Sequence, residues 1–354
     1  MAELREVMYQ KIVPSEDGHY LLTADIGGTN ANFGLFVTNQ VAKGILPLVA
    51  SFHYKSRFIT DFCELVNMVL SRIQTLYGIH ITQASFAAAG VISADGMHVK
   101  PTNLPVSIDL AAIRAKTSLT QVLLANDFEV IGYGLPFVDP ATLVLVNRGQ
   151  PYPHGHKAIL GAGTGLGKAV LFWDAAHKRY ETLASEGGHA DCVFLTHQEL
   201  EIAHFIQECE QFTDPVSWEG VLSGNGIKRL YQFFSSKISD GAVRHGADGP
   251  RPDEIFASRH DDAACMKTYE FYAQIYGRCA KNFALDALCL SGLYIAGGIA
   301  AKNLALFQQP VFMKEFISSG KQSERLKKVP IYVITDYNVS LYGAASLFLL
   351  RKGQ

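Results

Sequence analysis

The sequence predicts an α/β protein built from two related lobes. The first observation is a glycine-rich turn that occurs twice, in YLLTADIGGTNANFGLF at 20–36 and in AILGAGTGLGKAVLF at 158–172. Each turn separates two apolar runs, which is the pattern of a strand, a turn and a second strand. The second observation is that strand-like and helix-like segments alternate elsewhere, which favours partly parallel sheets. The third is that 354 residues with 48% hydrophobic content are enough for two cores.

The elements after the first hairpin belong to one lobe. A helix is predicted over 60–77, with Thr60 as its N-cap and Gly78 as its stop. Its apolar face is formed by Phe62, Leu65, Val66, Val69, Ile73 and Leu76. Short strands follow at 84–89 and 121–125, and the second of these delivers Asn126 and Asp127 at its end.

The second lobe repeats the scheme. Its predicted strands are 142–146, the two arms of the hairpin around 161–167, 293–295 and 331–334. A long buried helix is marked by Tyr269, Tyr272, Tyr276, Cys279 and Phe283. Asn338 is expected to cap a last helix that reaches residue 350, and 240–252 is expected to be a surface loop. We therefore predict a small α/β domain of residues 1–137 with 335–354, and a large α/β domain of 138–334.

Composition argues against several kinds of partner and location. A net charge of -2 gives no support for a nucleic-acid surface. The N-terminal residues carry charges where a signal peptide needs an apolar core. The most apolar long stretch, 283–301, contains Asp286 and three glycines, so we interpret it as a helix end, a turn and a buried strand instead of a membrane span. The six cysteines lack close spacing, which favours a cytoplasmic protein without a disulfide framework.

The two glycine turns suggest a polyphosphate ligand. Glycine allows backbone conformations in which consecutive N–H groups point at a phosphate, so two turns could clamp one polyphosphate. A Walker A loop is excluded because positions 162 and 169 are both alanine, and a dinucleotide fingerprint is excluded because its third glycine would be Leu166. Two ordinary hairpins with glycine-rich turns remain the alternative.

Six motifs occur in an order typical of one family: ADIGGTN, ANDFE, GAGTGLG, SEGGHAD, EGVLSGNGI and IAGGIA. In this respect the chain resembles the bacterial-type glucokinases, which belong to the superfamily of hexokinase, actin and the 70-kDa heat-shock chaperones. The resemblance extends from Ala24 to about Gly343. It implies two lobes of the ribonuclease-H-like, actin-like ATPase type with a nucleotide cleft between them.

The resemblance implies an ATP site made of three turns. The first phosphate loop would offer Gly27, Gly28, Thr29 and Asn30, with Asp25 holding Mg²⁺ through water. The second would offer Gly163, Thr164 and Gly165, and the adenosine would lie on Gly297 and Gly298. The alternatives from the residues alone are a turn-capping aspartate at Asp25 and close helix–strand packing at the last turn.

The sharpest catalytic candidate is Asp127, because phosphoryl transfer to an alcohol needs a placed carboxylate that accepts the hydroxyl proton. The resemblance implies that Asp127 is this base and that glucose is bound by Asn103, Asn126, Asp127, Glu186, His189 and Glu219. An Asx turn at Asn126–Asp127, a core or metal-bound His189 and a helix-opening Glu219 are the alternatives.

Two positions depart from the family pattern. Asn32 stands where the family commonly has arginine, and Cys192 stands where it more often has an aromatic residue. The zinc-binding cysteine cluster of the repressor/open-reading-frame/kinase sugar kinases is absent from the sequence, which separates the chain from that branch.

We therefore expect an ATP- and Mg²⁺-dependent glucokinase that phosphorylates the 6-hydroxyl of glucose, with no nucleic-acid or membrane partner; the resemblance also implies a homodimer. One alternative is a kinase for another hexose, such as mannose, fructose or an N-acetylhexosamine. The other is an actin-like ATPase or sugar-responsive binding protein, which would have no need of Glu186, His189 and Glu219 beside Asp127.

Overall fold

The computed structural model describes residues 5–9, 19–39, 46–101, 104, 106–238 and 249–352. The chain forms two compact units. The first unit consists of Met1–Pro140, Tyr180–Ala184 and Asn338–Gln354, and the second of Ala141–Arg179 and Ser185–Tyr337. The first unit therefore combines both ends of the chain with a short middle segment.

A six-stranded sheet forms the centre of the first unit. Its order is β1-β4-β3-β2-β5-β8. The strands are β1 (Arg5–Met8), β2 (Tyr20–Ile26), β3 (Asn30–Val37), β4 (Leu48–Lys55), β5 (Gln83–Ala88) and β8 (Gln121–Asn126). β2 and β3 form the predicted antiparallel hairpin, whereas β2, β5 and β8 run parallel. The first glycine turn is thus confirmed as a strand–turn–strand unit.

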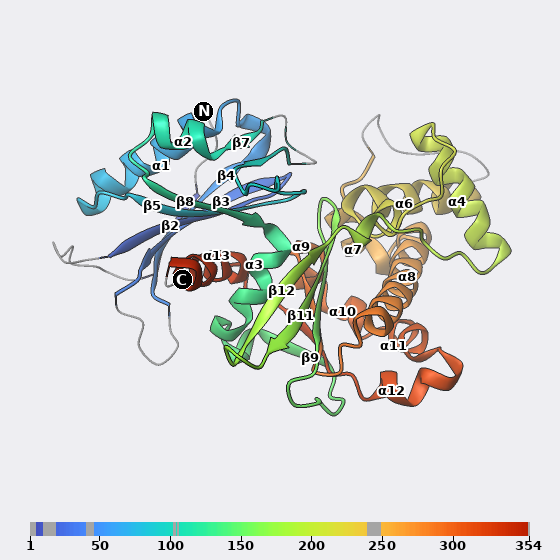
Figure 1. The fold of residues 1–354 in the computed structure, drawn as a ribbon. Coiled ribbons are helices and arrows are strands. Elements are labelled where there is room, and N and C mark those ends of the chain that lie inside the picture. Colours follow the sequence, from blue (N-terminus) through green and yellow to red (C-terminus); the bar gives the residue numbers. More distant parts are fainter. Residues whose placement is uncertain are drawn as a thin grey trace. The chain divides into compact units, whose positions relative to one another are not determined.

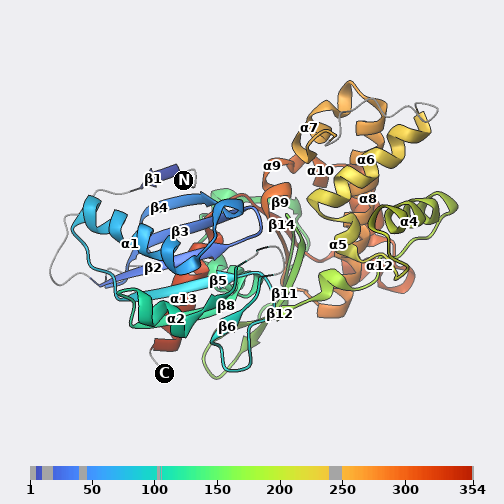
Figure 2. The ribbon, with the colours of Figure 1, turned by 90° about the horizontal axis from the view of Figure 1, so that it is seen from above.

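Helices cover both faces of this sheet. α1 (Phe62–Tyr77) and α2 (Leu110–Lys116) lie on one face, and α3 (Asp127–Gly134) with α13 (Val339–Lys352) lie on the other (Figure 1). Figure 2 shows α1 lying over the strands. A separate pair, β6 (His98–Val99) and β7 (Ile108–Asp109), is antiparallel.

The start of α1 corrects one prediction. The N-cap is Asp61, whose carboxylate accepts from the N–H groups of Cys63 and Glu64, and not Thr60. Asp61 is the N-cap in place of Thr60 because its carboxylate accepts from two of the free N–H groups of the first turn. Gly78 is the C-cap as predicted. Leu76, which we expected on the buried face, is 37% exposed near the end of the helix.

Five strands of the second unit follow the order β11-β10-β13-β14-β9. They are β9 (Leu143–Asn147), β10 (Lys157–Ala162), β11 (Leu166–Asp174), β13 (Leu293–Ala296) and β14 (Ile331–Ile334). β10 and β11 are antiparallel, whereas β10, β13 and β14 are parallel. This is the order and direction of β3, β2, β5 and β8 in the first unit, so the two sheets repeat one arrangement, and the second hairpin is confirmed.

The residues of β12 (Arg179–Ser185) are divided between the two units. Its residues Tyr180–Ala184 belong to the first unit. There the Tyr133 hydroxyl of α3 donates to the Glu181 carboxylate at 2.6 Å.

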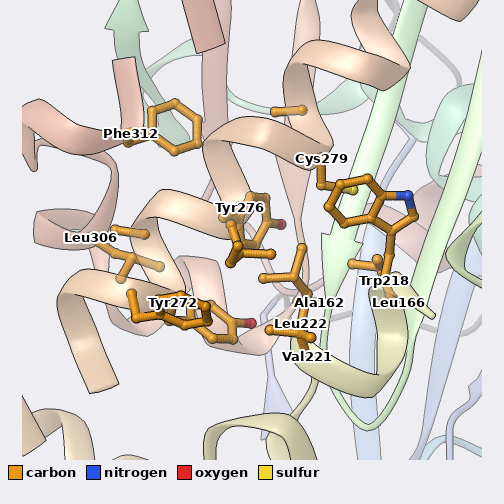
Figure 3. Packing of buried hydrophobic residues seen from close by; sticks show 14 of the residues in the cluster. Ala162, Leu166, Trp218, Val221, Leu222, Tyr272, Tyr276, Cys279, Leu306 and Phe312 are labelled. Atoms are coloured by element: carbon orange, nitrogen blue, oxygen red, sulfur yellow. The ribbon is translucent and has the colours of Figure 1, made fainter. Parts of the chain in front are cut away.

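The helical part of the second unit surrounds α8 (Ala263–Ala287) (Figure 1). The five residues predicted to mark a buried helix all lie in α8 and are buried. Tyr272 and Tyr276 pack between Val221 and Leu222 on one side and Leu306 and Phe312 on the other (Figure 3). The remaining α-helices are α4 (His197–Glu210), α5 (Trp218–Val221), α6 (Gly224–Ile238), α7 (Pro252–Ala257), α9 (Gly298–Lys302), α10 (Leu304–Phe307), α11 (Pro310–Ile317) and α12 (Ser323–Lys327).

Short 3₁₀ helices connect several elements. They are η1 (Ser56–Phe58), η2 (Leu135–Phe137), η3 (Pro140–Thr142), η4 (Gly187–His189), η5 (Ser258–His260) and η6 (Gly320–Gln322). The stretch 283–301 is a helix end, a turn, a buried strand and a short helix, which confirms the interpretation from its glycines. Among the described residues, none of the helices has the length and hydropathy that a bilayer crossing requires. Most of the predicted loop 240–252 lies outside the described residues, and α7 begins at its last residue.

Candidate active site

The first glycine turn presents backbone donors on its outer side. Gly27 N–H donates to the Asn30 carbonyl at 3.0 Å and closes the turn. The carbonyls of Gly27 and Thr29 accept from the hydroxyl and the N–H of Ser56, at 2.6 and 3.0 Å. Of the described residues, none accepts a hydrogen bond from Gly28 N–H. A bound anion could therefore use this donor, while the carbonyls are turned away towards Ser56.

Asp25 lies one residue before the end of β2. Its Oδ2 accepts a hydrogen bond of 2.6 Å from the Ser340 hydroxyl of α13. Burial raises the pKa of Asp25, and the hydrogen bond from Ser340 only partly opposes this. A buried carboxylate that resists ionisation is a suitable partner for a cation, because the cation would favour its charged form.

Asn126 and Asp127 stand at the junction of β8 and α3. The Asn126 Oδ1 accepts from Phe128 and Glu129 N–H at 2.9 and 3.2 Å, and its amide donates to the Gly90 carbonyl at 3.2 Å. The Asx-type cap that was the structural alternative is thus present at Asn126. Contact between Asn126 and a sugar stays a prediction.

Asp127 is the first residue of α3 and is partly buried. Its Oδ1 accepts from Phe128 N–H at 3.0 Å. The N-terminal end of a helix favours the carboxylate form of such a side chain, which is the form a general base needs.

The parallel pairing brings these aspartates to one edge of the first sheet. Asp25 is in register with Ala87 of β5, and Ala88 is in register with Asn126 of β8. Asp25 and Asp127 are therefore two strand spacings apart, about 10 Å. That separation leaves space for a phosphoryl group and its acceptor between them.

The second glycine turn is held by three hydrogen bonds within the second unit. Gly163 N–H donates to the Gly165 carbonyl at 2.8 Å, and Gly224 N–H donates to the Gly163 carbonyl at 3.0 Å. The Glu219 Oε2 accepts from Leu166 N–H at 2.8 Å. A methyl group at position 165 would lie 2.4 Å from that oxygen, so a larger residue would displace the Glu219 carboxylate.

The turn that carries Glu186 and His189 lies against the same residue, Leu166. A Cβ at Gly188 of η4 would be 1.8 Å from the Leu166 carbonyl oxygen. Trp218 N–H donates to the Ala190 carbonyl at 2.9 Å, which brings the start of α5 beside η4. Leu166 thus receives Glu219 at its N–H and the Glu186–His189 turn at its carbonyl.

The Glu186 and His189 side chains are about half exposed and 3.8 Å apart, Oε2 to Nε2. Each therefore still has polar groups that a ligand could use. The three predicted sugar-binding residues of the second unit, Glu186, His189 and Glu219, are gathered beside the second glycine turn.

The third turn lies next to the second. Gly161 of β10 is in register with Ala296 of β13, so Gly297 follows at the same edge. A Cβ at Gly297 would be 2.5 Å from the Ala162 carbonyl oxygen, and its φ is 93°, so close packing alone requires glycine there. At Gly298 the space is open. Asn103 lies outside the described residues.

A family model described as "Glucokinase" matches residues 22–350. The chain belongs to the glucokinase family. It is 30% identical over 342 residues to a glucokinase of Nostoc punctiforme, and this match covers 92% of this chain and 97% of that protein.

Solved structures agree with this membership. The crystal structure of a glucokinase from an Antarctic psychrotroph has a TM-score of 0.75 at 28% identity and covers 94% of this chain and 99% of that one. A ROK family glucokinase from Streptomyces griseus, in complex with glucose and AMPPNP, has a TM-score of 0.64 at 17% identity, covers 93% of this chain and 99% of that one, and shows likeness of fold alone. The predicted mixed α/β, actin-like fold is that of the glucokinase family.

The two departures from the family pattern have local explanations. The Asn32 Oδ1 is 2.8 Å from His53 Nδ1, so an imidazole accompanies the amide that replaces arginine. Burial and the charge of Arg5 lower the pKa of His53, so the pair is neutral near pH 7. Cys192 is buried, and burial raises its pKa.

Sequence reasoning missed two buried polar residues that lie beside the candidate site. Ser340, which contacts Asp25, is separated from it by 315 positions and carries no motif. Lys168 follows the second turn and is only 5% exposed, with its Nζ 5.8 Å from the centre of the Trp218 ring. A lysine at a core-facing position of an alternating strand was the signal that could have found it.

Proposed function

We propose that this protein transfers the γ-phosphoryl group of ATP to the 6-hydroxyl of glucose. The glucose oxygen attacks the γ-phosphorus, the bond from this phosphorus to the β–γ bridging oxygen breaks, and ADP leaves. Asp127 accepts the proton of the hydroxyl. The observation that carries the proposal is the place of Asp127 at the start of α3, on the sheet edge that also carries Asp25 and the first glycine turn.

We infer that the two compact units are the small and large domains predicted from the sequence. The repeated strand order supports their being related lobes of the actin-like type. Membership of the glucokinase family supports ATP as phosphoryl donor. The Streptomyces griseus protein, which has a similar fold, is in complex with AMPPNP. We also propose that the protein is a cytoplasmic homodimer.

The residues around Asp25 fit a hydrated Mg²⁺. Hard divalent cations prefer carboxylate oxygens and usually retain several waters when they bind nucleotides. Asp25 would hold the ion, which supplies neutralisation of phosphate charge when bound. Gly28 N–H of the first turn and Gly165 N–H of the second would bind phosphate oxygens, because Gly27 and Gly163 N–H close their own turns. Thr29, Asn30 and Thr164 would lie beside the phosphates, and Gly297–Gly298 would lie under the adenosine.

Glucose would be bound mainly by carboxylates. Ionised carboxylates accept strong hydrogen bonds from hydroxyl groups, and a hexose offers several hydroxyls in a ring. Glu186 and Glu219 would accept such bonds, and His189 would contact the anomeric end, with Asn126 and Asn103 completing the set. Leu166 N–H fixes one oxygen of Glu219, which orients the other.

A product assay tests the proposal directly. After incubation with glucose and MgATP, mass spectrometry should find glucose 6-phosphate and ADP in equal amounts. A panel with mannose, fructose and N-acetylglucosamine should give slower ADP release than glucose. A clear preference for another sugar would replace glucose in the proposal, and sugar-stimulated ATP consumption without a phosphorylated sugar would favour the actin-like ATPase.

Gly163→Ala tests the second phosphate loop. Apart from its two chain neighbours, no described residue has an atom within 4 Å of the position that the new Cβ would occupy, and φ is not positive, so the described fold does not require glycine. Stability should be unchanged or higher by about 0.4–1 kcal/mol, because alanine reduces the freedom of the unfolded chain. Loss of one or two phosphate hydrogen bonds should raise KM for ATP about 10–100-fold.

The same variant carries its own control. KM for glucose and the melting temperature should stay close to those of the unaltered protein. An unchanged KM for ATP in a well-folded variant would remove this turn from the nucleotide site.

A further inference from the structure

We propose that Ser340 is a positioning residue for Asp25, and that its hydroxyl orients the carboxylate that receives the metal ion of the nucleotide. The inference rests on the proposed function, in which Asp25 holds hydrated Mg²⁺. It adds a residue from the last helix of the chain to the nucleotide site.

The contact between the two side chains is short and shielded from water. The Ser340 hydroxyl donates to Asp25 Oδ2 at 2.6 Å, and Ser340 is 5% exposed. Hydrogen bonds to an ionised carboxylate are stronger than those between neutral groups. The backbone of Asp25 is fixed on both sides by β3 and β5, so the remaining freedom is rotation of its side chain, and Ser340 restricts that rotation.

The fold fixes the position of Ser340 as well. Helix α13 crosses α3 with glycines at the contact. A Cβ at Gly134 would be 2.1 Å from the Val339 carbonyl oxygen, and one at Gly343 would be 1.6 Å from the Val130 carbonyl oxygen. The two backbones are therefore in direct contact on either side of Ser340, and α13 cannot move towards α3.

The charge of Asp25 has no cationic partner among the described residues. Ser340 is its one hydrogen-bond partner there, through Oδ2, and no described lysine, arginine or histidine forms an ion pair with it. A carboxylate that served only to cap a turn would be bound by backbone N–H groups. The arrangement holds one oxygen with a neutral donor and leaves Oδ1 for a cation.

The contact also connects the metal site to the catalytic helix. α13 holds Asp25 through Ser340 and packs against α3, whose first residue is Asp127. One helix therefore sets the positions of the metal-binding carboxylate and of the proposed base.

The test compares Ser340→Ala with Ser346→Ala, a second buried serine of the same helix. Binding of Mn²⁺·ADP, measured by electron paramagnetic resonance, should weaken about tenfold in S340A, the scale of one charge-assisted hydrogen bond. S346A should bind like the unaltered protein. In S340A the Mg²⁺ concentration for half-maximal activity should rise similarly, while KM for glucose stays constant. Equal Mn²⁺·ADP affinity in S340A and S346A would overturn the proposal.

Three further variants separate the possible failures. S340T keeps the hydroxyl and should retain most of the metal affinity. S340C keeps the volume of the side chain but has a weaker donor, so it gives the same comparison if alanine impairs folding. Unchanged metal binding in S340C would also overturn the proposal.

D25N should lose Mn²⁺·ADP binding. If D25N retains it, the proposed role of Asp25 fails; if D25N loses it and S340A does not, only the role of Ser340 fails.

Discussion

Asp127→Ala should lower kcat by about 10²–10⁴-fold, the usual effect of removing a general base. The carboxylate lies at the N-terminal end of α3, where the helix favours its ionised form, and on the sheet edge shared with Asp25. Asp127→Asn should give a loss of similar size, because the amide keeps the shape of the side chain and cannot accept the proton. Steady-state kinetics with glucose and MgATP measure both variants.

Glu129→Gln is the matched control. Glu129 lies two residues further along the same helix, where its carboxylate forms a 3.2 Å ion pair with Arg351. Its replacement should leave kcat within a few fold of the unaltered value. Asp127→Ala should also cost only about 1 kcal/mol of stability, the usual cost of removing a capping side chain at the start of a helix. Turnover close to that of the unaltered protein in D127A would show that another group accepts the proton.

The two hairpins could be predicted because their signal is local. An apolar run, a glycine turn and a second apolar run specify a strand–turn–strand unit without information from elsewhere in the chain. The same holds for β14, predicted at 331–334, and for the buried side of α8. The error at Thr60 is also local: Thr60 and Asp61 are both good caps, and only the backbone geometry selects between them.

The grouping of the site residues could not be predicted from spacing. Leu166 binds Glu219 through its N–H and touches Gly188 at its carbonyl, and these contacts join three segments that are distant in sequence. The contact of Ser340 with Asp25 spans 315 positions. Such pairs depend on how α5 and α13 pack, and packing leaves no periodic signal in the sequence.

The Asn32 position shows a further limit. The sequence indicates only that the usual arginine is missing. The structure adds His53 beside the amide, with Ser51 Oγ 2.8 Å from the other ring nitrogen. Because cross-strand neighbours on β3 and β4 decide this environment, a single substitution cannot be interpreted without its partner strand.

Arg278→Met should destabilise the second unit by about 3–5 kcal/mol, the usual cost of removing one partner of a buried ion pair. Arg278 of α8 contacts Glu199 of α4 at 2.7 Å and Glu315 of α11 at 3.2 Å, and it donates to the Val193 carbonyl at 2.8 Å. Arg278 and Glu199 are both buried. Without the guanidinium, the Glu199 carboxylate is left charged in the interior. Lys281→Met, one turn further along α8 at an exposed contact to Ser318, should change stability by less than about 1 kcal/mol.

The pH dependence of the stability loss in R278M distinguishes an unpaired carboxylate from lost packing. Burial opposes ionisation of Glu199, but hydrogen bonds from Arg278 and Leu195 N–H outweigh it and lower its pKa below the ordinary 4.5. The pKa of Glu199 is therefore lower in the folded protein than in the unfolded chain. The ion pair with Arg278 stabilises the fold at pH values above the ordinary pKa, and this stabilisation is lost as the pH falls through the pKa of the folded protein. The difference in unfolding free energy between the unaltered protein and R278M, measured by denaturant titration, should therefore shrink as pH falls below about 4. A difference that stays constant with pH would mean that lost packing, and not the unpaired carboxylate, destabilises R278M. The double variant R278M/E199L gives a second test. If the unpaired carboxylate is the cause, R278M/E199L should recover part of the stability lost in R278M; if lost packing is the cause, it should be no more stable than R278M.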